Sequence, residues 1–200
     1  LVIKGQNPDG LDGVVFTTAS TANAQSIDIQ GAATGASSRG ITIDGSTLRA
    51  DRGLKLVGQG TAAGVYIGNT SEVFSDVDGY DGSVQMQIIG TGLGASGKGV
   101  VVVGSISNPT LRATDTGVVL ISGSTASASN DSIDFTGSSA ALLSAAATGQ
   151  VNIQGAVGPI WLGSATMSLS SGADDPQSFT VNGPQIYWSD SQLTSAGSVY

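Results

Sequence analysis

The sequence has no cysteine and no histidine, and Glu72 is its only glutamate. Without cysteine the chain can form neither disulfides nor thiolate metal sites, and without histidine the most frequent general base of enzymes is missing. Charged residues make up 11% and aromatic residues 5% of the 200 residues, whereas an ordinary domain has about 25% charged residues. These shortages favour a structural or contact role over a reaction.

Positive charge is also scarce. Only seven lysines and arginines are scattered along the chain, and the net charge is −8 with a pI near 4.1. Nucleic-acid binding needs clustered cations, so we expect neither a nucleic-acid partner nor attraction to an anionic membrane. No apolar run approaches the roughly 18 residues of a membrane span, so we expect no membrane insertion.

Small residues and short apolar runs are abundant instead. There are 30 glycines, and 40% of the residues are hydrophobic. The stretch from Ser26 to Gly53 contains the runs IDIQG and ITIDG, followed by TLRA and an expected turn, DRG. In each run the apolar residues lie two apart, which is the period of a strand with one buried face. We expect the glycines to mark the corners between strands.

The same plan recurs along the chain. With spacings of 26 to 33 residues, the pattern apolar-x-apolar-x-Gly ends at Gly5, Gly31, Gly58, Gly90, Gly123, Gly155 and Gly183. A second and a shorter third run follow most matches, so the repetition predicts an all-β chain, a parallel β-solenoid with three strands in each rung. The single segment 1–200 would contain about seven rungs, with approximate bounds 1–25, 26–53, 54–83, 84–117, 118–149, 150–176 and 177–200. A β-sandwich also has short strands and frequent turns, but it does not explain the recurrence in threes.

Alternation assigns the faces of the strands. The inward pairs are expected to be Leu1/Ile3, Ile27/Ile29, Leu54/Leu56, Met86/Ile88, Val119/Ile121, Val151/Ile153 and Phe179/Val181 in the first runs, and Val14/Phe16, Ile41/Ile43, Val65/Ile67, Val100/Val102, Ile133/Phe135, Ile160/Leu162 and Ile186/Trp188 in the second. The outward row of the second runs is then Val15, Thr42, Tyr66, Val101, Asp134, Trp161 and Tyr187. Its members Tyr66, Val101, Trp161 and Tyr187 are candidates for contact with glycans or with a neighbouring rod. The alternatives are that loops cover them or that the register slips by one residue.

Little in the sequence points to chemistry. Most aspartates stand in turn contexts, where they have a local structural role, and no carboxylate pair is marked out as a glycosidase site. The segment DVDGYDG offers Asp76, Asp78 and Asp81 as a candidate Ca²⁺ site, because calcium takes oxygen ligands from such loops. The alternative reading is a tight turn, since Asp-Gly is first a turn signal. We expect no catalytic residues and no cofactor other than this calcium candidate.

The phrases GITIDGSTLRA and GQVNIQGAVG resemble repeats of the filamentous-haemagglutinin type of secreted bacterial exoproteins and of autotransporter passengers. The resemblance covers nearly the whole chain. It implies a right-handed parallel β-helix at the bacterial cell surface or outside the cell, used as an adhesive or structural rod. The variable repeat length and the lack of a secretion-domain motif depart from that pattern.

Three functions follow as hypotheses. The first is a non-catalytic stalk or fibre segment of a giant adhesin-like protein, within a longer rod. The second is a glycan-binding or glycan-cleaving β-helix of the lyase or tailspike type, and the third is a self-assembling extracellular filament or sheath. The expected partners are adjacent repeats of the same polypeptide, further copies in lateral or end-to-end association, and glycans or a host or neighbouring cell surface.

Overall fold

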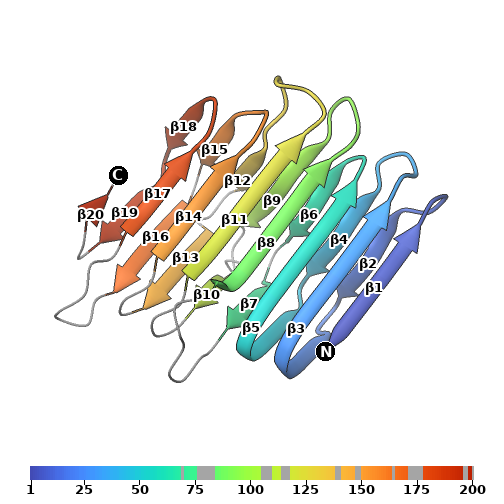
Figure 1. The fold of residues 1–200 in the computed structure, drawn as a ribbon, viewed down its shortest axis with the longest axis horizontal. Helices are drawn as coiled ribbons and strands as arrows, with labels where there is room; N and C mark the ends of the chain where they lie inside the picture. Colours follow the sequence, from blue (N-terminus) through green and yellow to red (C-terminus); the bar gives the residue numbers. More distant parts are fainter. Residues whose placement is uncertain are drawn as a thin grey trace.

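All the assigned elements of the protein are β-strands. The structure, a computed structural model, describes residues 1–68, 70–75, 84–104, 110–113, 118–137, 141–146, 150–163, 165–170, 178–195 and 198–199. Within these ranges there is no helix, and hence none that could cross a membrane. The strands form one 13-stranded and one 7-stranded sheet, and neighbouring strands are parallel (Figure 1). The prediction of an all-β chain is confirmed.

The strands fall into three sets that alternate along the chain. The first set consists of β1 (Val2–Asn7), β3 (Thr21–Ala33), β5 (Thr47–Gly60), β8 (Val84–Gly92), β11 (Val118–Thr125), β14 (Gln150–Gly155), β17 (Ser178–Asn182) and β20 (Ser198–Val199). The second set consists of β2 (Asp12–Thr17), β4 (Arg39–Asp44), β6 (Ala63–Ile67), β9 (Lys98–Gly104), β12 (Ile133–Gly137), β15 (Ile160–Gly163) and β18 (Ile186–Ser189). The third set consists of β7 (Glu72–Ser75), β10 (Thr110–Ala113), β13 (Ala141–Ala146), β16 (Ala165–Ser170) and β19 (Gln192–Ser195).

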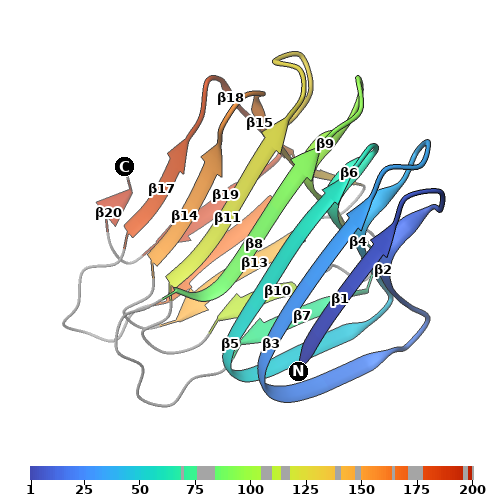
Figure 2. The same cartoon turned by 45° about the vertical axis from the view of Figure 1, so that its right-hand side comes forward.

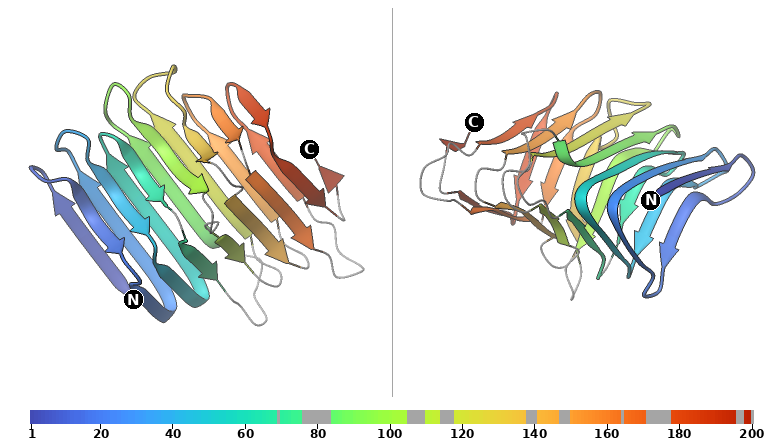
Figure 3. Two further views of the ribbon diagram at one scale, coloured as in Figure 1. Left: turned by 180° about the vertical axis from the view of Figure 1, so that it is seen from behind. Right: turned by 60° about the horizontal axis from the view of Figure 1, so that its bottom comes forward.

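Each strand pairs with its equivalents in the neighbouring repeats. The second set forms the 7-stranded sheet in chain order, from β2 to β18. The first and third sets share the 13-stranded sheet, because β3 and β5 run from one face of the molecule to the next without a break (Figures 2 and 3). Colour in Figure 1 accordingly changes from blue to red across the sheets. Long-range parallel pairing therefore connects each repeat to the next.

The predicted turn at DRG is wrong. Residues 51–53 lie inside β5, which continues from the TLRA run into the LKLVG run. The bend is made by an irregularity in the pairing of β3 with β5, between Ala24 and Ser26, where the register shifts. A bulge of this kind bends a strand without ending it, so the chain changes direction here without a turn.

The repeating glycines align residue by residue. Gly5 pairs with Gly31, and the row continues through Gly58, Gly90 and Gly123 to Gly155. These glycines lie within strands or at a strand end, rather than at the predicted corners. The first four of them face a second glycine row in the 7-stranded sheet, which consists of Gly13, Gly40, Gly64 and Gly99. A Cβ atom at Gly31 would lie 2.1 Å from the Gly40 carbonyl oxygen, and one at Gly58 would lie 2.0 Å from that of Gly64. Only glycine lets the two backbones approach this closely.

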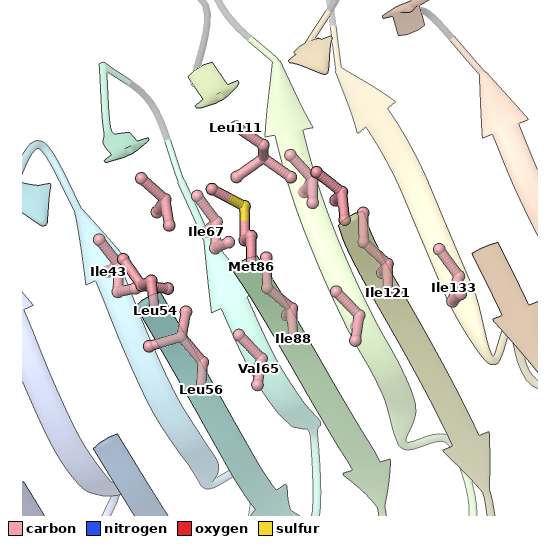
Figure 4. Packing of buried hydrophobic residues seen from close by; sticks show 14 of the residues in the cluster. Ile43, Leu54, Leu56, Val65, Ile67, Met86, Ile88, Leu111, Ile121 and Ile133 are labelled. Atoms are coloured by element: carbon pink, nitrogen blue, oxygen red, sulfur yellow. The ribbon is translucent and has the colours of Figure 1, made fainter. Parts of the chain in front are cut away.

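The core lies between the faces and consists of aliphatic rows. The predicted inward residues are buried in the central repeats, with Ile29, Leu56, Ile88 and Ile121 each at 0% exposure. Figure 4 shows how side chains from both sheets point into this space: Ile43, Leu54, Leu56, Val65, Ile67, Met86, Ile88, Leu111, Ile121 and Ile133. A buried aliphatic side chain of this size contributes roughly 1.5–3 kcal/mol, so the stack needs no disulfide.

Predicted inward residues are exposed at the outermost strands. Leu1 is 49% exposed, and Ile186 and Trp188 are 45% and 44% exposed. Ile186 and Trp188 pair in register with buried Ile160 and Leu162, but β18 is the edge strand of its sheet in the described part of the chain. Within a stacked row, a side chain is covered by the strands on both sides. A side chain on an edge strand is covered from one side only, because the strand has one neighbour.

Candidate functional site

The outer face of the 7-stranded sheet carries the predicted outward row. Val15 pairs with Thr42, Thr42 with Tyr66, and Tyr66 with Val101. The row continues from Val101 through Asp134 and Trp161 to Tyr187. Seven residues that are about thirty positions apart in the sequence thus form one line across the sheet. The predicted alignment of this row is confirmed, and a register slip is excluded.

The row is less exposed than expected. Thr42, Val101 and Asp134 are only 4%, 8% and 4% exposed, although they lie on the outer face. Thr42 and Asp134 each contact a side chain of the preceding repeat, Asp12 and Lys98, which stand three positions before the row members of their own strands. Val101 therefore offers little contact surface, and the row presents separate patches rather than a continuous aromatic strip.

Asp12 covers Thr42. Its Oδ2 accepts a hydrogen bond of 2.6 Å from the Thr42 hydroxyl, and its Oδ1 accepts one of 2.9 Å from the Arg39 backbone N–H. The carboxylate thus ties the edge strand β2 to β4, and burial of the threonine hydroxyl is compensated by a charge-assisted hydrogen bond. The role of Asp12 is structural.

Tyr66 is covered by a cation. The guanidinium carbon of Arg39 lies 3.8 Å from the centre of the Tyr66 ring, close enough for a strong cation–π contact. Burial raises the pKa of the Tyr66 hydroxyl above its usual value, the charge of Arg39 opposes this, and Asp44 adds to it. The outer face of this ring is therefore already occupied by a group of the same chain.

Lys98 neutralises the buried Asp134. Its ammonium group donates to Asp134 Oδ2 and lies 2.9 Å from Asp131 Oδ2. Burial raises the pKa of the Asp134 carboxyl, and the hydrogen bond and charge of Lys98 offset only part of the increase. Burial lowers the pKa of Lys98, but its hydrogen bonds to Asp134 and Asp131 outweigh this and raise it. The pair is an ionic contact that holds β9 against β12.

Trp161 and Tyr187 form the exposed part of the row. Each is 38% exposed, and their ring centres lie 5.0 Å apart with a tilt of 38° between the planes. The indole also lies over Gly163, because a Cβ atom at Gly163 would be 2.4 Å from Trp161 Nε1. We call this pair the aromatic shelf. Of the four predicted contact residues, the structure brings these two together as accessible surface.

The calcium candidates Asp76, Asp78 and Asp81 lie outside the described residues. Within the described ranges, no three His, Cys, Asp or Glu side chains gather as a metal ion would require. A shallow groove over the first strands is lined by Lys4, Gln6, Gln30 and Gln59 among others, and it contains no carboxylate. The described residues thus offer ionic, amide and aromatic contacts.

Sequence reasoning did not find the arginine over Tyr66 or the ring over Gly163. A signal for the second exists in the sequence: the aromatic residue of VYIG and of IWLG stands two positions before glycine, and the ring lies on the bare backbone. The contact of Arg39 with Tyr66 joins two different repeats, so no pattern in the sequence around either residue predicts it. No family model, curated protein or solved structure matches the chain.

Proposed function

We propose that the chain is a segment of a right-handed parallel β-helix, and that it serves as a non-catalytic stalk or fibre segment of a large bacterial surface or extracellular protein. One observation carries this proposal: in the described part of the chain the strands of successive repeats pair in parallel, residue for residue apart from two local register shifts. Such stacking adds length with each repeat and requires no special residue in any of them.

Further support comes from the residues on the outer face. The charged groups with short contacts are engaged in holding neighbouring strands together, as Asp12 holds Thr42 and Lys98 holds Asp134. The resemblance of GITIDGSTLRA to repeats of secreted bacterial exoproteins supports the extracellular location.

Removal of one whole repeat tests this proposal. Deleting residues 27–53 joins Ser26 to Leu54, which is the register partner of Ile27, so the strands can close again. We expect a folded chain with an unchanged β-type circular dichroism spectrum and a long axis about 4.8 Å shorter in small-angle scattering. Collapse of the fold would contradict a modular stalk. Release of reducing ends or unsaturated sugars from pectate, alginate or xylan by the intact chain would replace the stalk with the glycan-cleaving alternative.

A second candidate, self-association, is favoured by the edge strand β18. Its inward residues Ile186 and Trp188 are 45% and 44% exposed, and the edge of β18 has no partner strand among the described residues. A strand edge of this kind invites pairing with another strand. Sedimentation across a hundredfold range of concentration tests it. An increase in mass that Trp188→Ser abolishes supports association through β18, and a constant monomer mass rejects it.

A further inference from the structure

The two outer aromatic rings with a described cation contact are both covered by an arginine of a neighbouring repeat. Arg39 lies 3.8 Å from the ring centre of Tyr66 on the 7-stranded sheet, and Arg49 lies 4.5 Å from that of Phe74 on the other sheet. Arg49 is the direct register partner of Phe74. The fold therefore uses the same pair of groups, a guanidinium on a ring, at two independent places.

The aromatic shelf has the ring but not the arginine. Arg39 stands two residues before the inward Ile41, in the repeat that precedes Tyr66. The same position holds Asp131 in the repeat before Trp161, and Gly158 in the repeat before Tyr187. No cation of the described residues lies over either ring of the shelf. The position that supplies the arginine over Tyr66 therefore supplies no cation to either ring of the shelf.

The Trp161 ring lies over Gly163, just as the Tyr66 ring lies over Gly68, where an added Cβ atom would be 2.8 Å from Tyr66 Cε1. Because glycine carries no side chain, an atom of each ring approaches the backbone closely here. The Tyr66 ring carries a guanidinium group, whereas the Trp161 ring, 38% exposed and in contact with the Tyr187 ring, carries no cation of the described residues.

The negative charge near the shelf is only partly neutralised. Asp131 stands at the position of the arginine and Asp134 is the register partner of Trp161, and these two carboxylates share the ammonium group of Lys98. Asp190 is exposed in the turn that follows Tyr187, and the chain as a whole carries a net charge of −8. An aromatic face attracts cations through its quadrupole, and the surrounding carboxylates increase that attraction.

We propose that the aromatic shelf of Trp161 and Tyr187 binds an arginine side chain of a basic partner protein, by the contact that Arg39 makes with Tyr66. The partner supplies the guanidinium that the preceding repeats supply elsewhere in the chain. This inference does not depend on the stalk function.

The test uses a dye-labelled peptide, GRGRG, titrated against the full chain at low salt. The Trp188→Phe variant is the parent, because the chain has two tryptophans and this change leaves Trp161 as the only one. We expect saturable binding that changes Trp161 fluorescence. Binding to the Trp161→Ala variant is measured by the anisotropy of the labelled peptide. This substitution should weaken binding about two- to fivefold, which corresponds to an exposed cation–π contact, and Tyr187→Ala should also weaken it.

The matched probe replaces both arginines with citrulline, which has the same planar shape and no charge. It should bind at least twofold more weakly than GRGRG. Equal binding of the two peptides, or equal binding of GRGRG by the Trp161→Ala variant and its parent, would overturn the proposal. So would a saturable change of Trp161 fluorescence with cellohexaose and none with GRGRG, since that result would assign the shelf to a glycan. Circular dichroism of each variant confirms that the chain is folded.

Discussion

Arg39 lies with its guanidinium carbon 3.8 Å from the ring centre of Tyr66, although its register partner is Ala63. The side chain thus reaches along the neighbouring strand to a ring three residues further on. This diagonal contact joins two repeats on the outside of the sheet, where the aliphatic core contributes nothing.

The contact predicts a measurable coupling between the two residues. In a double-mutant cycle with Arg39→Ala and Tyr66→Leu, we expect a coupling free energy of about 0.5–1 kcal/mol from denaturant unfolding. The cycle of Lys55→Ala with Tyr66→Leu is the control, because exposed Lys55 lies on the other sheet. Equal coupling in both cycles would mean that the stacking adds no stability.

The glycine row predicts strongly unequal effects of one substitution. At Gly58 an added methyl group would lie 2.0 Å from the Gly64 carbonyl oxygen, which is fixed in a strand. At Gly183, the equivalent position of a later repeat, the nearest atom is the flexible Cδ1 of Ile160 at 2.8 Å. We expect Gly58→Ala to cost more than about 2 kcal/mol of unfolding free energy and Gly183→Ala less than about 1 kcal/mol. Similar losses at both positions would refute the backbone clash as the cause.

The ionic pair predicts unequal losses of stability when its two partners are replaced. Lys98→Met leaves Asp134 buried without its cation, and we expect the unfolding free energy to fall by about 1–3 kcal/mol at pH 8. This loss is smaller than for a fully buried pair because the Lys98 side chain is 36% exposed. Asp134→Asn should cost less than about 1 kcal/mol, since burial penalises the charged carboxylate more than Lys98 stabilises it. The double variant should recover most of the loss of Lys98→Met. Denaturant unfolding measures all three, and a larger loss in Asp134→Asn than in Lys98→Met would contradict the assignment.

The same pair predicts how stability varies with pH. The pKa of Asp134 is raised in the folded state, so its favourable contribution is complete below its unfolded pKa and declines as pH rises through the folded value. The pKa of Lys98 is raised as well, so its contribution persists until the solution is strongly alkaline. We therefore expect Asp134→Asn to flatten the decrease in stability that begins near pH 4, the ordinary pKa of an aspartate in an unfolded chain. An unchanged slope above this pH would show that other carboxyl groups cause it.

The core rows predict a contrast between the centre and the edge of the stack. Ile88 is fully buried, so Ile88→Ala should cost about 2–5 kcal/mol. Ile186 occupies an equivalent inward position but is 45% exposed, so Ile186→Ala should cost about 1 kcal/mol or less. Thermal and denaturant unfolding compare the two directly. Equal costs would mean that another part of the protein covers β18.

Local alternation predicted the strands and most of the core. Residues such as Ile27 and Ile29 can be assigned to the core from the sequence because they alternate with polar residues on a strand that has one buried face. Spacing of the glycines predicted which strands pair. The bend within β5 was missed because a register shift, visible only between two strands, replaces the turn expected at DRG. Burial of Thr42 and Asp134 was missed because their partners, Asp12 and Lys98, come from the preceding repeat. The exposure of Trp188 depends on what lies beyond its strand, which its own alternation does not encode.

The close approach of the glycine row in the 13-stranded sheet to the backbone of the 7-stranded sheet has a consequence for the loops that connect the two sheets. The segment from Gly58 to Gly64 is shorter than the segment from Gly123 to Ser132, yet an added Cβ would lie 2.0 Å from the facing carbonyl oxygen in the first case and 1.8 Å in the second. The backbones at the two ends of each of these loops approach about equally closely, whatever the length of the loop between them. Foreign peptides grafted into the exposed stretch at Ala128 and Ser129 would therefore be displayed along one side without changing the spacing of the repeats.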